Sequence, residues 1–421
     1  MLLIIFARLN GGLTMNIREL RNMFPALSRT VYGKQLVYFD NAATAQRSQS
    51  VIDKWTQLTI GANANIHRAV HKLAVDATDE YESTRDAVKE YINAAAREEI
   101  VFTSGTTGSI NLVAFSFGET FVNKGDEIIV SESEHHSNIV PWQMLCQRKG
   151  AVLRVLHVDE DGHLNLKELK SLLNPKTRIV AVTQISNVLG ILNPVKEIVS
   201  VCHSVGCPVL IDGAQGMVHE GVDVQDVDCD FYAFSGHKLY AATGTGVLYG
   251  KRKWLDQMVP YQGGGEMIAT VRFSGTTYAP LPEKFEAGTQ NINAIPTLEP
   301  AIEMLKLMKD KELLNAQEAV SQYLFHALTS NPRIRLYGVP RGTETKIPLF
   351  SFSVEGAHHE DLALILDKMG IAVRSGQMCA EPLMDRFGVT GMLRASLAPY
   401  NTIEEAEYFI KSLDKAIAML V

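Results

Sequence analysis

Long hydrophobic runs and clusters of basic residues are both missing from the 421-residue sequence. The apolar stretch near the N-terminus, residues 2–6, is shorter than a signal-peptide core and far shorter than a membrane-spanning helix. The net charge is −7, whereas nucleic acids and anionic membranes bind proteins through clustered Lys and Arg. We therefore expect no nucleic acid and no membrane as a partner. Small molecules are the expected ligands.

Cysteine is scarce as well: the chain has five, an odd number, and no two are spaced as Cys-x-x-Cys. Cysteine-based zinc sites and thioredoxin-like redox sites typically use such a pair. Scattered free cysteines are typical of a reducing compartment, so we expect a cytoplasmic protein. The five are Cys146, Cys202, Cys207, Cys229 and Cys379.

What the sequence does contain is ordinary globular material, 46% hydrophobic and 21% charged. Its length predicts two domains. Residues 30–292 are expected to form the larger domain, and residues 15–29 together with 293–421 a smaller α+β domain. We interpret residues 1–14 as a disordered leader or an over-extended start site, because Met15 begins a more ordinary sequence.

Between residues 98 and 250, short β-branched runs alternate with amphipathic stretches of helix length. Strands that are apolar on both faces and separated by helices build a mostly parallel sheet covered by helices. The pattern therefore predicts an α/β fold. Strands are expected at residues 128–130, 152–156, 178–183, 208–211, 231–234 and 246–249.

The pattern changes after this region. Residues 263–288 are rich in Gly and Pro, which predicts a long loop lying over a site. The elements that follow are typical of an α+β domain, joined by a helix near residues 17–23. Helices are expected at residues 296–330, 360–369 and 403–420, and strands at 349–354, 371–374 and 393–397.

The strongest local signal is SGHKLYAATGTG, residues 235–246, in which Lys238 comes directly after an apolar strand. A lysine tucked against the end of a sheet loses solvent, which favours the neutral amine that forms a Schiff base with an aldehyde. A surface lysine after a strand has the same pattern, so the motif alone leaves both interpretations open. Gly244 and Gly246 lack the strand-then-helix context of a dinucleotide site.

A carboxylate ends the apolar strand in VLIDGAQ, residues 209–215. Asp212 stands at the carboxyl end of this strand, where α/β sheets bind ligands. It is either a helix N-cap or the partner of a buried cation such as a protonated pyridine nitrogen. Gln215 follows one turn later and is expected to donate to the phenolic oxygen of the same ring.

Residues 102–115, FTSGTTGSINLVAF, predict a strand, a turn of small residues and a helix. Amides and hydroxyls converge at such a helix N-terminus, which makes it a cradle for phosphate. Ser104, Thr106 and Thr107 are the expected donors. Turns of this kind also occur without ligands, so the motif alone leaves the question open.

Two histidine pairs, His135–His136 and His358–His359, raise the question of a metal. Adjacent residues point apart on a strand or a helix, so neither pair chelates an ion alone, and no metal is expected. His135 follows the strand at residues 128–130, at the carboxyl edge of the predicted sheet. Its flat imidazole is expected to stack on a cofactor ring.

Cys379 lies in RSGQMCAEP, between Gly376 and Pro382. It is the one cysteine in a loop framed by Gly and Pro, which predicts an accessible thiolate, while an ordinary free cysteine remains the alternative. Arg394 follows fifteen residues later. Its guanidinium group is suited either to bidentate hydrogen bonding with a ligand carboxylate or to an ion pair within the protein.

Taken together, these motifs resemble the fold-type I pyridoxal-phosphate (PLP) enzymes, and among them the group II cysteine desulfurases of the SufS and CsdA kind. The resemblance covers residues 24–420 and implies a large domain with a mostly parallel seven-stranded sheet plus a smaller α+β domain. Ten segments stand in the family's order: YFDNAATAQ, HRAVH, SGTT, SEHHSNIVPWQML, ISNVLG, VLIDGAQ, FYAFSGHKLYAATGTG, EAGTQN, VRSGQMC and LRASLAPYNT.

The resemblance assigns a role to each site residue. Lys238 would hold PLP covalently, Asp212 would pair with the pyridine nitrogen and Gln215 with the phenolic oxygen, and His135 would stack on the ring. Thr106, Thr107, Ser235 and His237 would bind the phosphate, with Thr289 reaching in from the other subunit of a homodimer. The implied substrate-binding residues are Arg394, Asn187, Ala42 and His67.

The resemblance also implies the reaction, in which L-cysteine becomes L-alanine and Cys379 keeps the sulfur as a persulfide. A small acceptor protein of the SufE or SufU kind would take this sulfur for iron–sulfur cluster assembly or related biosynthesis. The nearest alternative is a selenocysteine lyase or a cysteine sulfinate desulfinase on the same scaffold. An aminotransferase and a catalytically silent scaffold for sulfur delivery are more remote alternatives.

One residue departs from the family pattern: Gly108 stands where these relatives usually have Glu after the two threonines. In the family that Glu lies near the dimer interface and the active site. Communication between subunits or the transfer of sulfur is therefore expected to differ here. The residues before Met15 also have no family counterpart.

Overall fold

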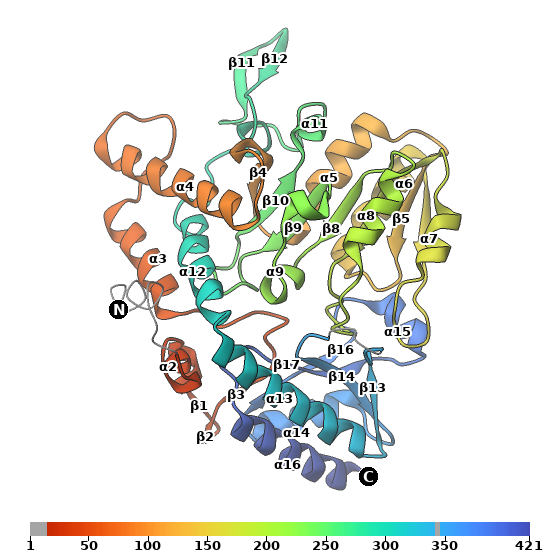
Figure 1. Cartoon of the computed structure of the whole chain (residues 1–421). Coiled ribbons are helices and arrows are strands. Elements are labelled where there is room, and N and C mark those ends of the chain that lie inside the picture. Colours follow the sequence, from red (N-terminus) through yellow and green to blue (C-terminus); the bar gives the residue numbers. More distant parts are fainter. Residues whose placement is uncertain (1–14, 342–345) are drawn as a thin grey trace.

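The computed structural model describes residues 15–341 and 346–421, so the interpretation of residues 1–14 lies outside the described residues. Its largest sheet has seven strands, and a separate four-stranded sheet follows later in the chain (Figure 1). The predicted α/β fold with a mostly parallel seven-stranded sheet is confirmed. The domain boundaries at residues 29/30 and 292/293 stay a prediction.

The seven-stranded sheet has the strand order β4-β10-β9-β8-β7-β5-β6. The last five strands in this order run parallel, and β10 is antiparallel to both of its neighbours. All six strands predicted for this region are present. The bounds are β4 (Ile100–Thr103), β5 (Glu127–Ser131), β6 (Val152–Leu156), β7 (Thr177–Thr183), β8 (Val209–Asp212), β9 (Phe231–Ser235) and β10 (Gly246–Gly250).

Successive side chains of the central strands enter two different hydrophobic cores, one on each face of the sheet. In β7, Ile179 and Ala181 belong to one core, and Val180 and Val182 belong to the other. A strand buried on both faces is a nearly continuous apolar run, which is why these strands can be found from the sequence. The first core includes α5 (Thr106–Phe121) and α6 (Val140–Lys149), and the second α4 (Lys72–Tyr91), α7 (Leu166–Leu172), α8 (Val195–His203) and α12 (Leu298–Met308).

The smaller sheet is antiparallel, with the order β13-β14-β17-β16, and packs on three long helices. The predicted helix at residues 296–330 is two helices, because Asp310 caps a second one. The predicted strand at residues 371–374 is likewise two, and β13 was not predicted. The bounds are α13 (Lys311–Ser330), β13 (Ile334–Tyr337), β14 (Leu349–Val354), α14 (His359–Lys368), β15 (Ile371–Ala372), β16 (Arg374–Gly376), β17 (Met392–Ser396) and α16 (Ile403–Leu420).

The prediction of one long loop at residues 263–288 is wrong in its middle. An antiparallel hairpin forms there from β11 (Ile268–Arg272) and β12 (Gly275–Tyr278), and it projects from the body of the molecule (Figure 1). Its residues are exposed except for the half-buried Ile268. A strand exposed on both faces has no pattern of buried positions, so nothing in its sequence distinguishes it from a loop.

The remaining elements are short or lie near the N-terminus. The predicted N-terminal helix is α2, and β3 pairs in parallel with β15, which follows α14. None of the helices in residues 15–341 and 346–421 has the length and hydrophobicity that a membrane crossing requires. The bounds are α2 (Ile17–Asn22), β1 (Thr30–Val31), β2 (Lys34–Gln35), β3 (Val37–Tyr38), α3 (Gln49–Gly61), α9 (Gly216–His219), α10 (Val224–Val227), α11 (Arg252–Leu255) and α15 (Glu381–Phe387).

Candidate active site

A cavity of about 240 Å³ lies where the chain leaves the carboxyl ends of β5, β7, β8 and β9. Parallel strands end at the same edge of a sheet, so these segments converge there, as the sequence predicts. All the predicted site residues line the cavity except His67, Thr289 and Ser104. Those that line it are Ala42, Thr106, Thr107, His135, Asn187, Asp212, Gln215, Ser235, His237, Lys238, Cys379 and Arg394.

Asp212 and Lys238 form the charged centre of this cavity. Asp212 ends β8 and is 3% exposed, and Lys238 follows β9 by three residues and is half-buried. Burial raises the pKa of Asp212 and lowers the pKa of Lys238, and the opposite charge of each partly offsets the shift of the other. A lysine whose neutral form is favoured is a nucleophile, and its place in the cavity removes the surface-lysine interpretation.

Asp212 is not the N-cap of the following helix. Its Oδ1 accepts a hydrogen bond from the backbone N–H of Ala214 over 2.9 Å, two residues ahead of α9. Gln215 donates its side-chain amide to the main-chain carbonyl of Ala42 over 2.7 Å. This contact ties the segment around Ala42 to the edge of the large sheet, so Gln215 and Ala42 lie side by side in the cavity wall.

The N-terminus of α5 meets the end of β9 through one hydroxyl. Ser235 Oγ accepts the backbone N–H of Thr106 over 2.8 Å and lies 2.7 Å from the Thr106 hydroxyl. A Cβ on Gly246 in β10 would lie 2.3 Å from Gly105 Cα, so only glycine allows the two segments to approach this closely. The expected donor Ser104 is exposed and does not line the cavity.

His135 is held as a neutral ring. Its Nδ1 accepts the backbone N–H of Ser137 over 3.1 Å. Burial, with smaller contributions from the nearby Lys238, His136 and Arg394, lowers the pKa of His135 to about 4. A half-buried, uncharged imidazole is suited to stacking on a flat ligand. His237 is likewise kept neutral by burial and by Lys238, with a pKa of about 4.

Sequence reasoning missed a buried carboxyl next to His135. Glu134 accepts the backbone N–H of Thr183 over 2.8 Å and the side-chain amide of Asn138 over 2.7 Å. Burial raises the pKa of Glu134 to about 8. These contacts join the ends of β5 and β7 and fix the turn that carries His135. Nothing in the sequence distinguishes this Glu from an exposed one.

Arg394 is buried, with 2% of its surface exposed, and only some nitrogens of its guanidinium group have hydrogen-bond partners. It donates to the main-chain carbonyl of Asn187 over 2.7 Å and to Asp40 Oδ1 over 3.2 Å, whereas its buried Nε has no hydrogen-bond partner. Arg374 at the start of β16 also lines the cavity, and the sequence did not predict it. Two guanidinium groups therefore offer donors to an anionic ligand.

Asn187 is already engaged on its other side. Its side-chain amide donates to the main-chain carbonyl of Met378 over 2.8 Å. The amide that the resemblance assigns to the substrate therefore also holds the loop of Cys379.

Cys379 is the exposed cysteine among the five; the other four are buried. Burial raises the pKa of Cys146 and raises that of Cys202 to about 12, which keeps these thiols protonated. Cys379 and Met378 both have left-handed backbone conformations, with φ of 56° and 53°. Non-glycine residues rarely adopt this conformation, so the surrounding contacts must hold the loop.

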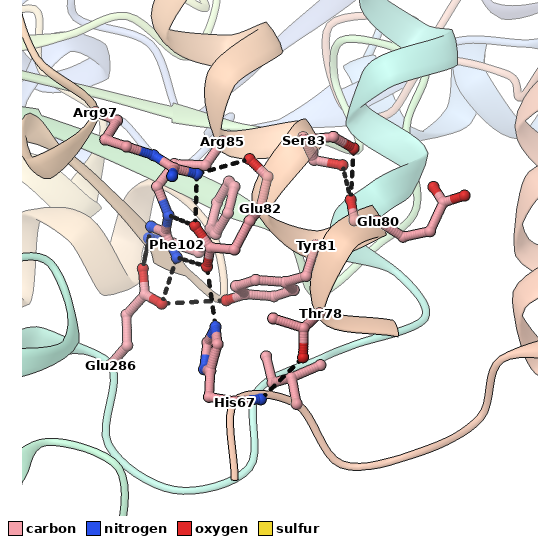
Figure 2. Close-up of polar contacts among 12 residues, drawn as sticks. His67, Thr78, Glu80, Tyr81, Glu82, Ser83, Arg85, Arg97, Phe102 and Glu286 are labelled. Carbon is pink, nitrogen blue, oxygen red and sulfur yellow. Dashed lines mark hydrogen bonds and ion pairs between the residues drawn. The ribbon is translucent and has the colours of Figure 1, made fainter. Parts of the chain in front are cut away.

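His67 lies outside the cavity, in a polar cluster around α4 (Figure 2). Its Nε2 is 3.0 Å from Glu82 Oε1. Burial alone would raise the pKa of Glu82, but the hydrogen bonds and charges of His67 and Arg85 outweigh it and lower this pKa to about 2. The role of His67 in substrate binding stays a prediction.

The centre of the same cluster is a buried ion pair. Arg85 NH1 donates to Glu286 Oε1 over 2.7 Å, and the two side chains are 1% and 3% exposed. Glu286 Oε1 also accepts the backbone N–H of Phe102 over 2.7 Å. Glu286 is three residues from Thr289, so the ion pair ties the segment of Thr289 to α4 and the hydrogen bond from Phe102 ties it to β4; Figure 2 shows Glu286 with Arg85 and Phe102. Thr289 itself is exposed, and its contribution to another subunit stays a prediction.

Gly108 lies in the first turn of α5. A Cβ at this position would lie 2.8 Å from Ser104 Oγ, so a side chain there requires Ser104 to move.

Within the described part of the chain, no group of three or more His, Cys, Asp or Glu side chains is arranged to hold a metal ion.

The fold and the residues that line the cavity together indicate the class of protein to which the chain belongs. The aminotransferase class-V model matches residues 37–409, and the chain belongs to this family. Its central sheet is that of the fold-type I PLP enzymes.

Within the family, the similar proteins are cysteine desulfurases. The cysteine desulfurase of Pectobacterium carotovorum subsp. carotovorum is 45% identical over 405 residues, which cover 96% of this chain and 98% of the relative. The crystal structure of the cysteine desulfurase CsdA from Escherichia coli has a TM-score of 0.89 and 39% identity, covering 97% of this chain and all of that one. The apo structure of the cysteine desulfurase from Thermococcus onnurineus NA1 has a TM-score of 0.90 and 34% identity, covering 97% of this chain and all of that one.

Proposed function

We propose that this protein is a PLP-dependent cysteine desulfurase, which takes the sulfur of L-cysteine onto Cys379 and releases L-alanine. One observation carries the proposal: a single cavity brings together a desolvated lysine, a buried aspartate and an exposed cysteine, Lys238, Asp212 and Cys379. The 45% identity to cysteine desulfurases over nearly the whole chain supports it.

The residues present fit PLP. The N-terminus of α5, with the hydroxyls of Thr106 and Ser235, suits a phosphate, and the Asp212 carboxylate suits a protonated ring nitrogen. His135 offers a neutral ring for stacking, and Lys238 the amine that binds an aldehyde. When bound, PLP withdraws electrons from an attached amino acid, so that bonds to its Cα break heterolytically.

Arg394 is the residue that would hold the substrate carboxylate. Its Nε is buried without a partner, and its other two nitrogens are fixed by Asn187 and Asp40. A guanidinium that is already positioned loses little freedom when it binds, so the carboxylate is oriented at small entropic cost. Lys238, whose pKa burial lowers, would then take the proton from the substrate Cα as a neutral amine.

Cys379 would carry out the transfer of sulfur. Its thiolate attacks the substrate sulfur, a sulfur–sulfur bond forms, and the carbon–sulfur bond breaks. The electron pair of the broken bond stays with the three-carbon fragment, which is protonated and leaves as alanine. Cys379 retains the sulfur as a persulfide, and no external oxidant is needed.

The persulfide would pass to a small acceptor protein of the SufE or SufU kind, because Cys379 lies on an exposed turn that such a protein can approach.

We also propose a homodimer in which Thr289 of one subunit contributes to the phosphate site of the other. The five cysteines form no disulfide, which supports a cytoplasmic location.

Substrate comparison tests the proposal. Wild type and Cys379→Ala are each given L-cysteine, L-selenocysteine and L-cysteine sulfinate, and alanine is measured. We expect Cys379→Ala to lose turnover of L-cysteine while it still binds PLP. Equal rates on L-cysteine in both proteins would contradict the role of Cys379 and favour the selenocysteine lyase or sulfinate desulfinase alternative.

A second variant tests the lysine. Lys238→Ala is expected to lose both turnover and the visible absorbance band of covalently held PLP. A normal band in this variant would remove Lys238 from its proposed role.

A further inference from the structure

The loop that carries Cys379 is held by two residues on the segments that follow β7 and β5 of the large sheet, Asn187 and His136. On one side of the cysteine, Asn187 donates its amide to the carbonyl of Met378 over 2.8 Å. On the other side, the backbone N–H of His136 donates to the carbonyl of Cys379 over 2.7 Å. Each contact crosses between segments far apart in the sequence, so the loop position is set by the large sheet.

His136 makes a second contact with this loop through its ring. The backbone N–H of Glu381 donates to His136 Nε2 over 3.0 Å. Glu381 is the first residue of α15, and the residue before it, Ala380, has no side chain that could cap the helix. A backbone N–H can only donate, so Nε2 of the His136 ring is the acceptor in this contact.

The backbone around Cys379 needs such support. Met378 and Cys379 are consecutive non-glycine residues with φ of 53° and 56°, a conformation that is unfavourable for residues with a Cβ. Cys379 is exposed, so its own side chain supplies little packing that could hold this conformation. Without outside contacts the loop would relax to other conformations, and the thiol would leave the cavity for part of the time.

We propose that His136 is a positioning residue for the nucleophile, and that its ring, together with Asn187, keeps the Cys379 thiol directed into the cavity. His136 does not line the cavity itself, in contrast to its neighbour His135, and it contacts the Cys379 loop at Cys379 and Glu381. The proposal deepens the proposed function and rests on it for the expected kinetics.

The test compares four proteins: wild type, His136→Ala, His136→Gln and His358→Ala. Gln is as long as His to the accepting atom and restores an acceptor for the Glu381 N–H. His358 is the matched control, because its ring Nδ1 accepts the backbone N–H of Glu360 at 3.4 Å at the start of α14, outside the cavity lining. Its replacement removes a similar cap without touching Cys379.

The first readout needs no substrate. Hydrogen exchange of the peptide that spans residues 377–383 is measured in the PLP-loaded protein. We expect His136→Ala to exchange about tenfold faster than wild type, the factor that corresponds to loss of one hydrogen bond, with His136→Gln in between and His358→Ala unchanged. Unchanged exchange in His136→Ala, or an equal change in His358→Ala, would overturn the proposal.

The second readout is the division of the effect between kcat and KM for L-cysteine. We expect His136→Ala to lower kcat about tenfold with KM nearly unchanged, and His136→Gln to recover most of the rate. An unchanged kcat in His136→Ala, or a Gln variant no better than the Ala variant, would overturn the positioning role. If wild type itself forms no alanine from L-cysteine, the proposed function fails, and the exchange readout still decides whether His136 holds the loop.

Discussion

The hydroxyl of Ser235 lies 2.7 Å from the hydroxyl of Thr106 and also accepts the Thr106 backbone N–H over 2.8 Å. Through this pair the end of β9 and the start of α5 are locked together across 129 residues of sequence. The pair lines the cavity where the resemblance expects the phosphate of PLP. A phosphate bound here, as the resemblance implies, would therefore meet donors that are already held in place.

Removing the Ser235 hydroxyl is expected to weaken PLP binding. Ser235→Ala loses one donor to a charged group and leaves Thr106 without its partner, so the Kd for PLP should rise about tenfold. Titration of the cofactor-free protein with PLP, followed by absorbance, measures this. Ser109→Ala is the control, because Ser109 makes a similar hydroxyl contact with Thr103 over 2.8 Å but does not line the cavity. An equal rise in both variants would contradict the phosphate assignment.

Breaking the buried ion pair is expected to destabilise the fold. Glu286→Gln removes one of the two carboxylates that pair with the Arg85 guanidinium, which is 1% exposed, and leaves only Glu82, so the free energy of unfolding should fall by about 3 kcal/mol. Adding Arg85→Met to this variant removes the buried charge that Glu286 no longer balances and should recover part of the loss. Urea unfolding of the two single variants and the double variant measures both effects. A double variant whose losses simply add would show that the two charges do not interact.

The low pKa of Glu82 predicts a dependence of stability on pH. Its pKa falls from the ordinary 4.5 to about 2 in the folded protein, because His67 and Arg85 outweigh the opposing effect of burial. The ionised form is therefore the one that stabilises the fold. This contribution is complete above pH 4.5 and is lost as the pH falls towards 2.

Glu82→Gln removes that contribution. Between about pH 6 and about pH 3, the stability of wild type should fall more steeply than that of the variant, with roughly 3 kcal/mol as the upper limit of the difference and less after solvent screening. Unfolding by urea at several pH values measures the two slopes, and Glu160→Gln at an exposed position is the control. Parallel slopes for wild type and Glu82→Gln would contradict the assignment.

The large sheet and the cavity could be predicted from the sequence for one physical reason. Strands buried on both faces are continuous apolar runs, and the polar residue that ends such a run, like Asp212 after β8, reaches the edge where ligands bind. The hairpin at β11 and β12 could not be predicted, because its strands are exposed and have no buried face.

Contacts between segments far apart in the chain could not be predicted from the sequence either. Arg85 and Glu286 are 201 residues apart, and each alone has the pattern of an exposed charge. Glu134 was missed for the same reason, since its contact with Thr183 joins residues 49 positions apart. His136 was considered as part of a histidine pair, but its contact with Glu381 joins residues 245 positions apart.

The central claim is that Cys379 receives the sulfur of the substrate. Peptide mass spectrometry after a single turnover with L-cysteine, under conditions that preserve persulfides, tests it most directly. We predict one additional sulfur atom on the peptide that contains Cys379 and none on the peptides that contain the four buried cysteines. Alanine formed in equal amount to the protein while the Cys379 peptide keeps its original mass would contradict the claim.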